Sequence, residues 1–159
     1  MTSQVLSDQR STSVEAWVRL LRSQAALRRV FDGQLQSDHG LTLNDFEALL
    51  TLAHEDGRMR RVDLAERLLL TPSGVTRLLD GLEKAGLVEK GSCASDARVT
   101  YAVLTADGRR RLEKAADSHL AAVSALLEER FAADELETLA ELLGRLPGAD
   151  RASASECRP

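Results

Sequence analysis

A polar stretch near the middle of the chain, TPSGVTR at residues 71–77, carries the side chains best suited to recognising another molecule. Arg77 has a planar guanidinium that can donate two parallel hydrogen bonds to the edge of a guanine base. Ser73 and Thr76 have hydroxyls that can bond to bases or to phosphates. These residue types at this spacing indicate nucleic-acid recognition, provided that one element presents them together.

A helix would present them together, because helix-start and helix-stop signals flank the stretch. Thr71 is a good N-cap, Pro72 favours the first helical position, and Gly86 suits the position just past a helix end. The sequence therefore predicts a helix over residues 72–85.

This predicted helix has one apolar and one polar face. Backbone amides at Ser73 and Gly74 would be free to hold a phosphate at the positive end of the helix dipole. The simpler interpretation is an amphipathic helix whose outer face is only solvated. The apolar face consists of Val75, Leu78, Leu79 and Leu82, and the polar face of Ser73, Thr76, Arg77, Asp80 and Lys84.

The hydrophobic period changes from helical to two immediately after this helix. Residues 87–90 are predicted to form a short strand, residues 91–97 a polar tip, and residues 99–103 a second strand. Because a shorter helix is predicted just before Thr71, the order is helix, turn, helix and hairpin. This order is typical of a helix-turn-helix followed by a wing.

The predicted wing carries a second set of binding side chains. Arg98 near the tip can enter a narrow minor groove, and Asp96 can orient its guanidinium through a charged hydrogen bond. Lys90 at the base suits a phosphate. The alternative for Asp96 and Arg98 is a surface ion pair that adds little to stability.

Helical periodicity extends over most of the remaining chain. A short helix over residues 61–69 precedes the polar stretch, and longer helices lie on either side. The fold class expected is therefore mainly α with a small β-hairpin wing. The longer helices are predicted to open with the capping residues Thr12, Thr42, Thr105 and Asp134, and the short helix to start at about Arg61.

Charge is distributed unevenly along the 159 residues. The whole chain has a net charge of −4 and is 43% apolar, which excludes a disordered chain or a polybasic protein that coats nucleic acid. Residues 58–111 hold 11 Lys and Arg against 7 Asp and Glu, whereas the rest holds 10 against 18. The basic excess coincides with the predicted binding face, so affinity for double-stranded DNA should fall steeply with salt.

Several other function classes find no support in the sequence. No apolar run approaches the roughly 18 residues of a membrane span, and residues 1–12 lack the apolar stretch of a signal peptide, so a cytoplasmic protein is expected. Cys93 and Cys157 are the two cysteines, with no CxxC motif or metal-binding spacing. Without a catalytic motif, neither an enzyme nor a cofactor is expected.

Residues 64–108, read as LAERLLLTPSGVTRLLDGLEKAGLVEKGSCASDARVTYAVLTADG, resemble the MarR family of winged-helix regulators. The pattern LA..L, S.VTRL.D.LE..GLV, D.R and LT..G carries the resemblance, which extends more loosely by helix order over residues 14–146. The resemblance implies an obligate homodimer on a palindromic operator, usually as a repressor. It places Ser73, Thr76 and Arg77 on the major-groove helix, and Asp96 and Arg98 on the wing.

The expected domain organisation follows from this resemblance and from the surplus apolar surface of the outer helices, which calls for a partner. Residues 12–146 form one domain, with polar, flexible ends at 1–11 and 147–159. Within it, the winged helix-turn-helix covers about residues 42–104, and dimerisation helices cover about 12–39 and 106–146.

The resemblance also implies that a small aromatic or anionic ligand releases the DNA from a crevice beside the dimer helices. Trp17 and Asp63 are the candidate ligand-binding residues. The simpler interpretations, which we favour, are that Trp17 anchors the core and that Asp63 favours the N-terminus of its helix.

Two alternatives to a ligand-relieved regulator remain open. One is a protein-protein interaction module that keeps a winged-helix scaffold. The other is a thiol-based redox-sensing regulator that uses Cys93. We expect Cys93 to be inert, because no basic residue nearer than Lys90 is present to lower its pKa.

Overall fold

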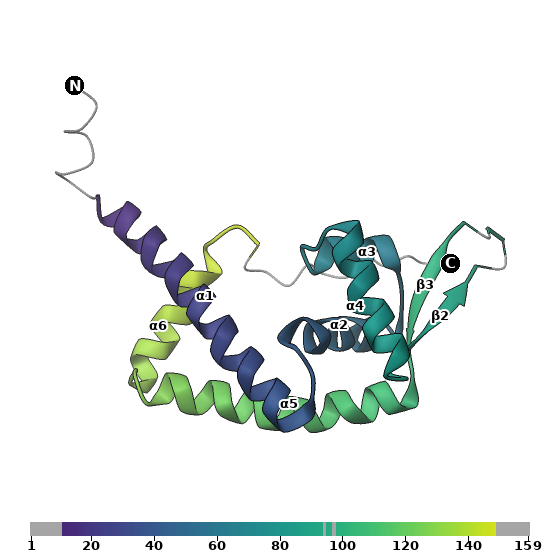
Figure 1. Cartoon of the computed structure of the whole chain (residues 1–159). Coiled ribbons are helices and arrows are strands. Elements are labelled where there is room, and N and C mark those ends of the chain that lie inside the picture. Colours follow the sequence, from purple (N-terminus) through teal and green to yellow (C-terminus); the bar gives the residue numbers. More distant parts are fainter. Residues whose placement is uncertain (1–10, 94, 97, 149–159) are drawn as a thin grey trace. The chain divides into compact units, whose positions relative to one another are not determined.

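The computed structural model (Figure 1) describes residues 11–93, 95–96 and 98–148. Its contacts divide the chain into two compact units, residues 1–43 and 44–159. The flexible ends expected at 1–11 and 147–159 fall almost entirely outside the described residues. Within those residues, no helix is long and apolar enough to span a membrane.

The first unit consists mainly of helix α1, Thr12–His39. Its N-cap is Ser11, whose hydroxyl accepts a hydrogen bond from the Val14 amide at 3.4 Å, so the prediction that Thr12 caps the helix is wrong by one residue. Gly40 ends the helix with a φ of +65°, a conformation that glycine adopts at little cost.

The second unit contains the remaining helices and a small sheet, which confirms the mainly α fold class with a wing. Its helix α4 begins after Thr71 and is followed by Gly86 with a φ of +72°, as the capping signals predict. The elements are α2 (Leu43–His54), β1 (Arg58–Arg60), α3 (Arg61–Arg67), α4 (Pro72–Lys84), β2 (Val88–Ser92), β3 (Thr100–Leu104), α5 (Ala106–Glu128) and α6 (Ala133–Gly144).

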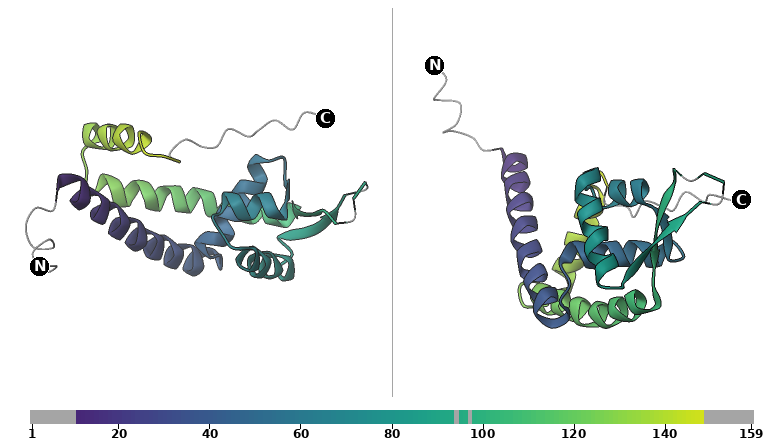
Figure 2. Two further views of the ribbon diagram at one scale, coloured as in Figure 1. Left: turned by 90° about the horizontal axis from the view of Figure 1, so that it is seen from above. Right: turned by 45° about the vertical axis from the view of Figure 1, so that its right-hand side comes forward.

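The sheet has three antiparallel strands in the order β1-β3-β2, one more than the predicted hairpin. Strand β1 pairs Met59 with Ala102, and both side chains are buried. Strand β2 pairs with β3 as far as Ser92 opposite Thr100, so the tip predicted from residue 91 starts later. Figure 2 shows the β2–β3 hairpin projecting beyond the helices of its unit.

The core of the second unit lies where α2, α3, α4 and the sheet meet. Apolar side chains from all of these elements are removed from water there, and this burial supplies the main driving force that holds the elements together. The fully or almost fully buried residues of this core include Phe46, Leu49, Leu52, Met59, Leu64, Val75, Leu79, Leu82, Val88 and Ala102.

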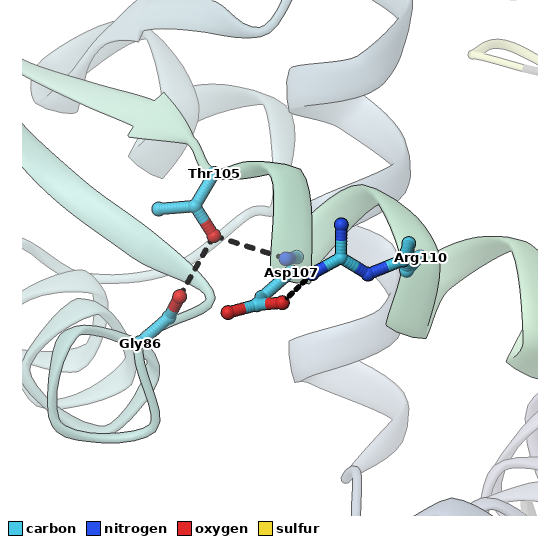
Figure 3. Close-up of polar contacts among 5 residues, drawn as sticks. Gly86, Thr105, Asp107 and Arg110 are labelled. Carbon is cyan, nitrogen blue, oxygen red and sulfur yellow. Dashed lines mark hydrogen bonds and ion pairs between the residues drawn. The ribbon is translucent and has the colours of Figure 1, made fainter.

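Helix α5 starts against the turn that joins α4 to β2 (Figure 3). The Thr105 hydroxyl donates a hydrogen bond to the Gly86 carbonyl at 2.7 Å and accepts one from the Gly108 amide at 3.0 Å. The Thr105 amide donates to the Leu87 carbonyl at 3.1 Å. These bonds tie the wing and helix α4 to the first turn of α5, which an Asp107–Arg110 ion pair also stabilises.

The last helix, α6, turns back from the end of α5 (Figure 1). It begins at Ala133 rather than at Asp134 as predicted, because the Glu135 carboxylate accepts a hydrogen bond from the Ala132 amide at 2.9 Å. None of its residues is buried within the chain.

Gly108 lies so close to the Leu87 carbonyl that we expect a substitution there to lower stability. A Cβ on this residue would lie 2.0 Å from the Leu87 carbonyl oxygen, so Gly108→Ala should lower the free energy of unfolding by about 3 kcal/mol. Gly81→Ala is the matched control, because a Cβ there meets no atom within 4 Å, and it should stabilise helix α4 by about 0.5–1 kcal/mol. Urea unfolding at one fixed protein concentration measures both. Equal effects of the two substitutions would contradict the close-packing explanation.

Candidate nucleic-acid interface

The first turn of α4 is closed by its own N-cap. The Thr71 hydroxyl accepts a hydrogen bond from the Gly74 amide at 3.1 Å and lies 3.2 Å from the Ser73 hydroxyl. The prediction of a free Gly74 amide is therefore wrong, because the capping side chain already binds it. This first turn contains no acidic residue, so no carboxylate offsets the positive end of the helix dipole.

The two faces of α4 are as predicted from the helical period. Val75, Leu79 and Leu82 are buried, whereas Ser73, Thr76, Arg77 and Lys84 are exposed on the other face. Leu78 and Asp80 are intermediate.

Thr76 and Arg77 differ in what they leave available for a ligand. The Thr76 hydroxyl donates to the Pro72 carbonyl at 2.9 Å, so its oxygen can still accept a hydrogen bond but has no second proton to give. Arg77 is exposed, and its side chain makes no hydrogen bond or ion pair to another described residue. The guanidinium of Arg77 on α4 is thus available to donate hydrogen bonds to a ligand.

At the tip of the wing, Asp96 shapes the backbone. Its carboxylate accepts a hydrogen bond from the Arg98 backbone amide at 2.9 Å, and its carbonyl accepts one from the Val99 amide at 3.1 Å. The predicted bond to the Arg98 guanidinium is absent among the described residues, because the aspartate forms a local turn instead. The exposed Arg98 side chain is left to bind elsewhere.

Lys90 connects the base of the wing to α4. Its ammonium lies 3.3 Å from the Glu83 carboxylate and is more than half exposed. Because exposed ion pairs are weak, this contact orients Lys90 while leaving it accessible to a phosphate.

Sequence analysis missed Arg58 and Tyr101 as parts of this surface. The guanidinium carbon of Arg58 lies 4.0 Å from the centre of the Tyr101 ring, and its Nη2 donates to the Ser92 carbonyl at 3.0 Å. The burial of Met59 between two exposed arginines fits a strand, but three residues are too few for the alternation to predict one from the sequence.

Cys93 has a more activating environment than the sequence indicated. Its sulfur lies 3.1 Å from the Ser95 hydroxyl, and this hydrogen bond lowers the pKa of the thiol below its usual value. Backbone hydrogen bonds from Ser95 and Asp96 lower the pKa further. These causes are hydrogen bonds and include no basic residue, so considering only basic neighbours in the sequence missed them.

The two candidate ligand-binding residues lie in different units. Trp17 on α1 is 58% exposed, so the prediction that it anchors the core of its own chain is wrong. Asp63 lies in the first turn of α3, where both carboxylate oxygens bind the Arg60 guanidinium, at 2.7 and 2.9 Å. Its place agrees with the interpretation that it favours that helix N-terminus.

One histidine has a perturbed environment in the second unit. The His119 ring on α5 lies 4.9 Å from that of Phe46 on α2, and burial lowers the pKa of His119. The described residues contain no cluster of three or more His, Cys, Asp or Glu side chains that could hold a metal ion.

Comparison with known proteins places this arrangement in a family. The sequence profile of the MarR family matches residues 39–99. The HTH-type transcriptional repressor Rv2887 of Mycobacterium tuberculosis is 34% identical over 127 residues, which cover 80% of this chain and 89% of that protein. The HTH-type transcriptional repressor YetL of Bacillus subtilis is 32% identical over 108 residues, and this match covers 67% of the chain and 64% of YetL.

Solved structures give the same result. AbsC, a MarR family transcriptional regulator from Streptomyces coelicolor, is 32% identical with a TM-score of 0.74, over 86% of this chain and 93% of AbsC. Sco3205 from the same organism, solved in complex with DNA, is 28% identical with a TM-score of 0.74, over 86% of this chain and 88% of Sco3205. The chain belongs to the MarR family of DNA-binding transcriptional regulators.

Proposed function

We propose that the chain is a homodimeric repressor of a palindromic operator, in which α4 enters the major groove and the β2–β3 wing the adjacent minor groove. The observation that carries this proposal is the exposed N-terminal half of α4, where Ser73, Thr76 and the uncommitted Arg77 lie opposite a buried apolar face. A regulator of this kind acts in the cytoplasm, on the DNA.

The distribution of charge along the chain also supports DNA binding by α4 and the wing. Residues 58–111 carry a net charge of +4 and the remainder −8, so phosphates are attracted to one part of the chain and repelled by the rest. In this proposal Lys84 and Lys90 bind phosphates and Thr71 fixes the first turn. The related Sco3205 was solved in complex with DNA, which is the same class of ligand.

Apolar side chains left uncovered on the outer helices support a dimer. Large exposed apolar surfaces are uncommon on monomers and mark association sites. A two-fold dimer would cover them and would set two α4 helices about one DNA turn apart. The uncovered residues include Val14, Trp17 and Leu21 on α1, Leu120 on α5, and Leu142 and Leu143 on α6.

Relief by a small aromatic or anionic ligand completes the proposal. It is supported by the exposure of the Trp17 indole, which offers an aromatic surface with a hydrogen-bond donor. Asp63 is a weaker candidate for this site, because Arg60 already occupies its carboxylate.

Selection from a pool of randomised duplex DNA tests the proposal as a whole. Enrichment of a two-fold repeat, with binding that weakens steeply as salt rises, is the expected result. A folded dimer that enriches no sequence, and whose weak binding barely responds to salt, would favour a protein-protein interaction module instead.

Substitutions of Arg77 and of Arg98 should affect binding to the selected duplex in different ways. Arg77→Ala should weaken binding by about 1–3 kcal/mol and relax the preference at one base position, because it reads a base edge. Arg98→Ala should weaken binding while leaving the major-groove preference unchanged. Fluorescence anisotropy on the selected duplex and on single-base variants separates the two effects. Full discrimination by Arg77→Ala would exclude it as a base-reading residue.

A charge on α6 should prevent dimerisation. Leu142 is 49% exposed in the isolated chain, and Leu142→Glu would bury an unpaired carboxylate at the proposed interface, which is strongly unfavourable. Light scattering should then report a monomer at concentrations where the unmodified chain is a dimer. Val62→Glu is the control, since Val62 is similarly exposed on α3, outside that interface. A dimer that tolerates Leu142→Glu would exclude α6 from the interface.

Ligand binding can be followed through the single tryptophan of the chain. Benzoate and phenol serve as probes. Either should change Trp17 fluorescence saturably and release the selected duplex over the same concentration range, because one site controls both signals. Trp17→Phe should keep DNA binding and weaken release. Release without any change in fluorescence would place the ligand elsewhere.

A further inference from the structure

The side chain of Arg58 spans all three strands of the sheet. Strands β1 and β2 are not neighbours, since β3 lies between them, and two strand spacings amount to about 10 Å. Arg58 starts on β1, its guanidinium lies 4.0 Å from the centre of the Tyr101 ring on β3, and its Nη2 reaches the Ser92 carbonyl on β2 at 3.0 Å. One side chain therefore connects the two outer strands.

Gly91 leaves the space that this crossing needs. It pairs with Tyr101 in the sheet register. A Cβ on Gly91 would lie 2.9 Å from the Val103 side chain, 3.2 Å from the Tyr101 Cβ and 4.0 Å from the Arg58 Nε. A side chain at this position would displace Val103 and Tyr101, so it would disturb Arg58 indirectly, through the Tyr101 ring on which the guanidinium lies.

The three contacts need arginine rather than any cation. A guanidinium can stack flat on an aromatic ring and still direct an N–H from its edge to a carbonyl. A lysine ammonium carries the same charge but has no flat face and no fixed fork. Arg58→Lys therefore removes the geometry and keeps the charge.

Ser92 is the point at which this connection affects the wing. The Ser92–Thr100 pair is the last one in the β2–β3 ladder, and Arg98 lies beyond it in the turn shaped by Asp96. A two-stranded ribbon is marginally stable in water, so an anchor on its last pair limits fraying toward the tip. A tip that is ordered before binding loses less entropy when it docks.

We propose that Arg58 is a positioning residue for DNA binding, which, with Tyr101 and Gly91, holds the wing so that Arg98 meets the DNA. This inference rests on the proposed function. Arg58 acts through the wing rather than by contacting DNA, because its guanidinium is committed to Tyr101 and Ser92.

Binding of the full-length dimer to the selected duplex, measured by anisotropy, tests the inference. Arg58→Lys should weaken binding about 3- to 10-fold although charge is kept, as expected from the loss of a cation–π contact and a charged hydrogen bond. Tyr101→Leu and Gly91→Ala should weaken binding similarly. Tyr101→Phe is the matched control and should bind like the unmodified chain, because the ring remains.

A double-mutant cycle with Arg98 separates positioning from bulk charge. In the Arg98→Ala background, Arg58→Lys should add little further loss, because the residue it positions is absent. Hydrogen exchange of the free protein gives an independent readout: amides of β2 and β3 should exchange faster in Arg58→Lys and Tyr101→Leu and remain unchanged in Tyr101→Phe.

Each outcome decides between the alternatives. Unchanged binding by Arg58→Lys while Arg98→Ala weakens it would overturn the positioning role, as would additive losses in the cycle. Equal losses in Tyr101→Phe and Tyr101→Leu would also overturn it. If the unmodified dimer enriches no duplex, the proposed function fails, and the role of Arg58 in DNA binding fails with it. Faster exchange in the variants would then report only a structural contact.

Discussion

The arrangement of the second unit depends on one close approach, that of the first turn of α5 to the Leu87 carbonyl. A Cβ on Gly108 would lie 2.0 Å from that oxygen, so only glycine permits the contact. Thr105 reinforces it with a side-chain bond to Gly86 and a backbone bond to Leu87. The end of α4, the start of β2 and the start of α5 thus meet in one junction without a linker. The orientation of α5 is therefore fixed directly against α4 and the wing.

Elements defined by local signals could be predicted from the sequence. Helix α4 was predicted to within a residue because Thr71, Pro72 and Gly86 act through backbone groups close in the chain. Strand β1 could not be predicted in this way, because its three residues gain strand geometry only by pairing with β3, some forty residues away. The Arg58 contacts depend on that pairing and were missed for the same reason.

In the candidate site, too, some features follow from local sequence patterns and others do not. The exposure of Arg77 follows from the helical period, and that of Arg98 from its place in the polar tip between the two strands. The partner of Asp96 does not, because a local turn competes with the expected bond to the Arg98 guanidinium. The partner of Gly74 does follow from the sequence, because a Thr71 N-cap accepts a hydrogen bond from this amide. Trp17 was expected in a core because it is apolar, and its 58% exposure indicates a surface that this chain does not cover by itself.

The exposure of helix α6 bears on how the activity of the protein depends on its concentration. It has twelve residues and buries none of them within its chain, and helices of this length are marginal in water without tertiary contacts. In the proposed dimer the order of α6 would depend on association, and the amount of active regulator would then rise more steeply than the amount of protein. A dimer of this kind would have a concentration threshold, below which a newly made chain would not act on its target.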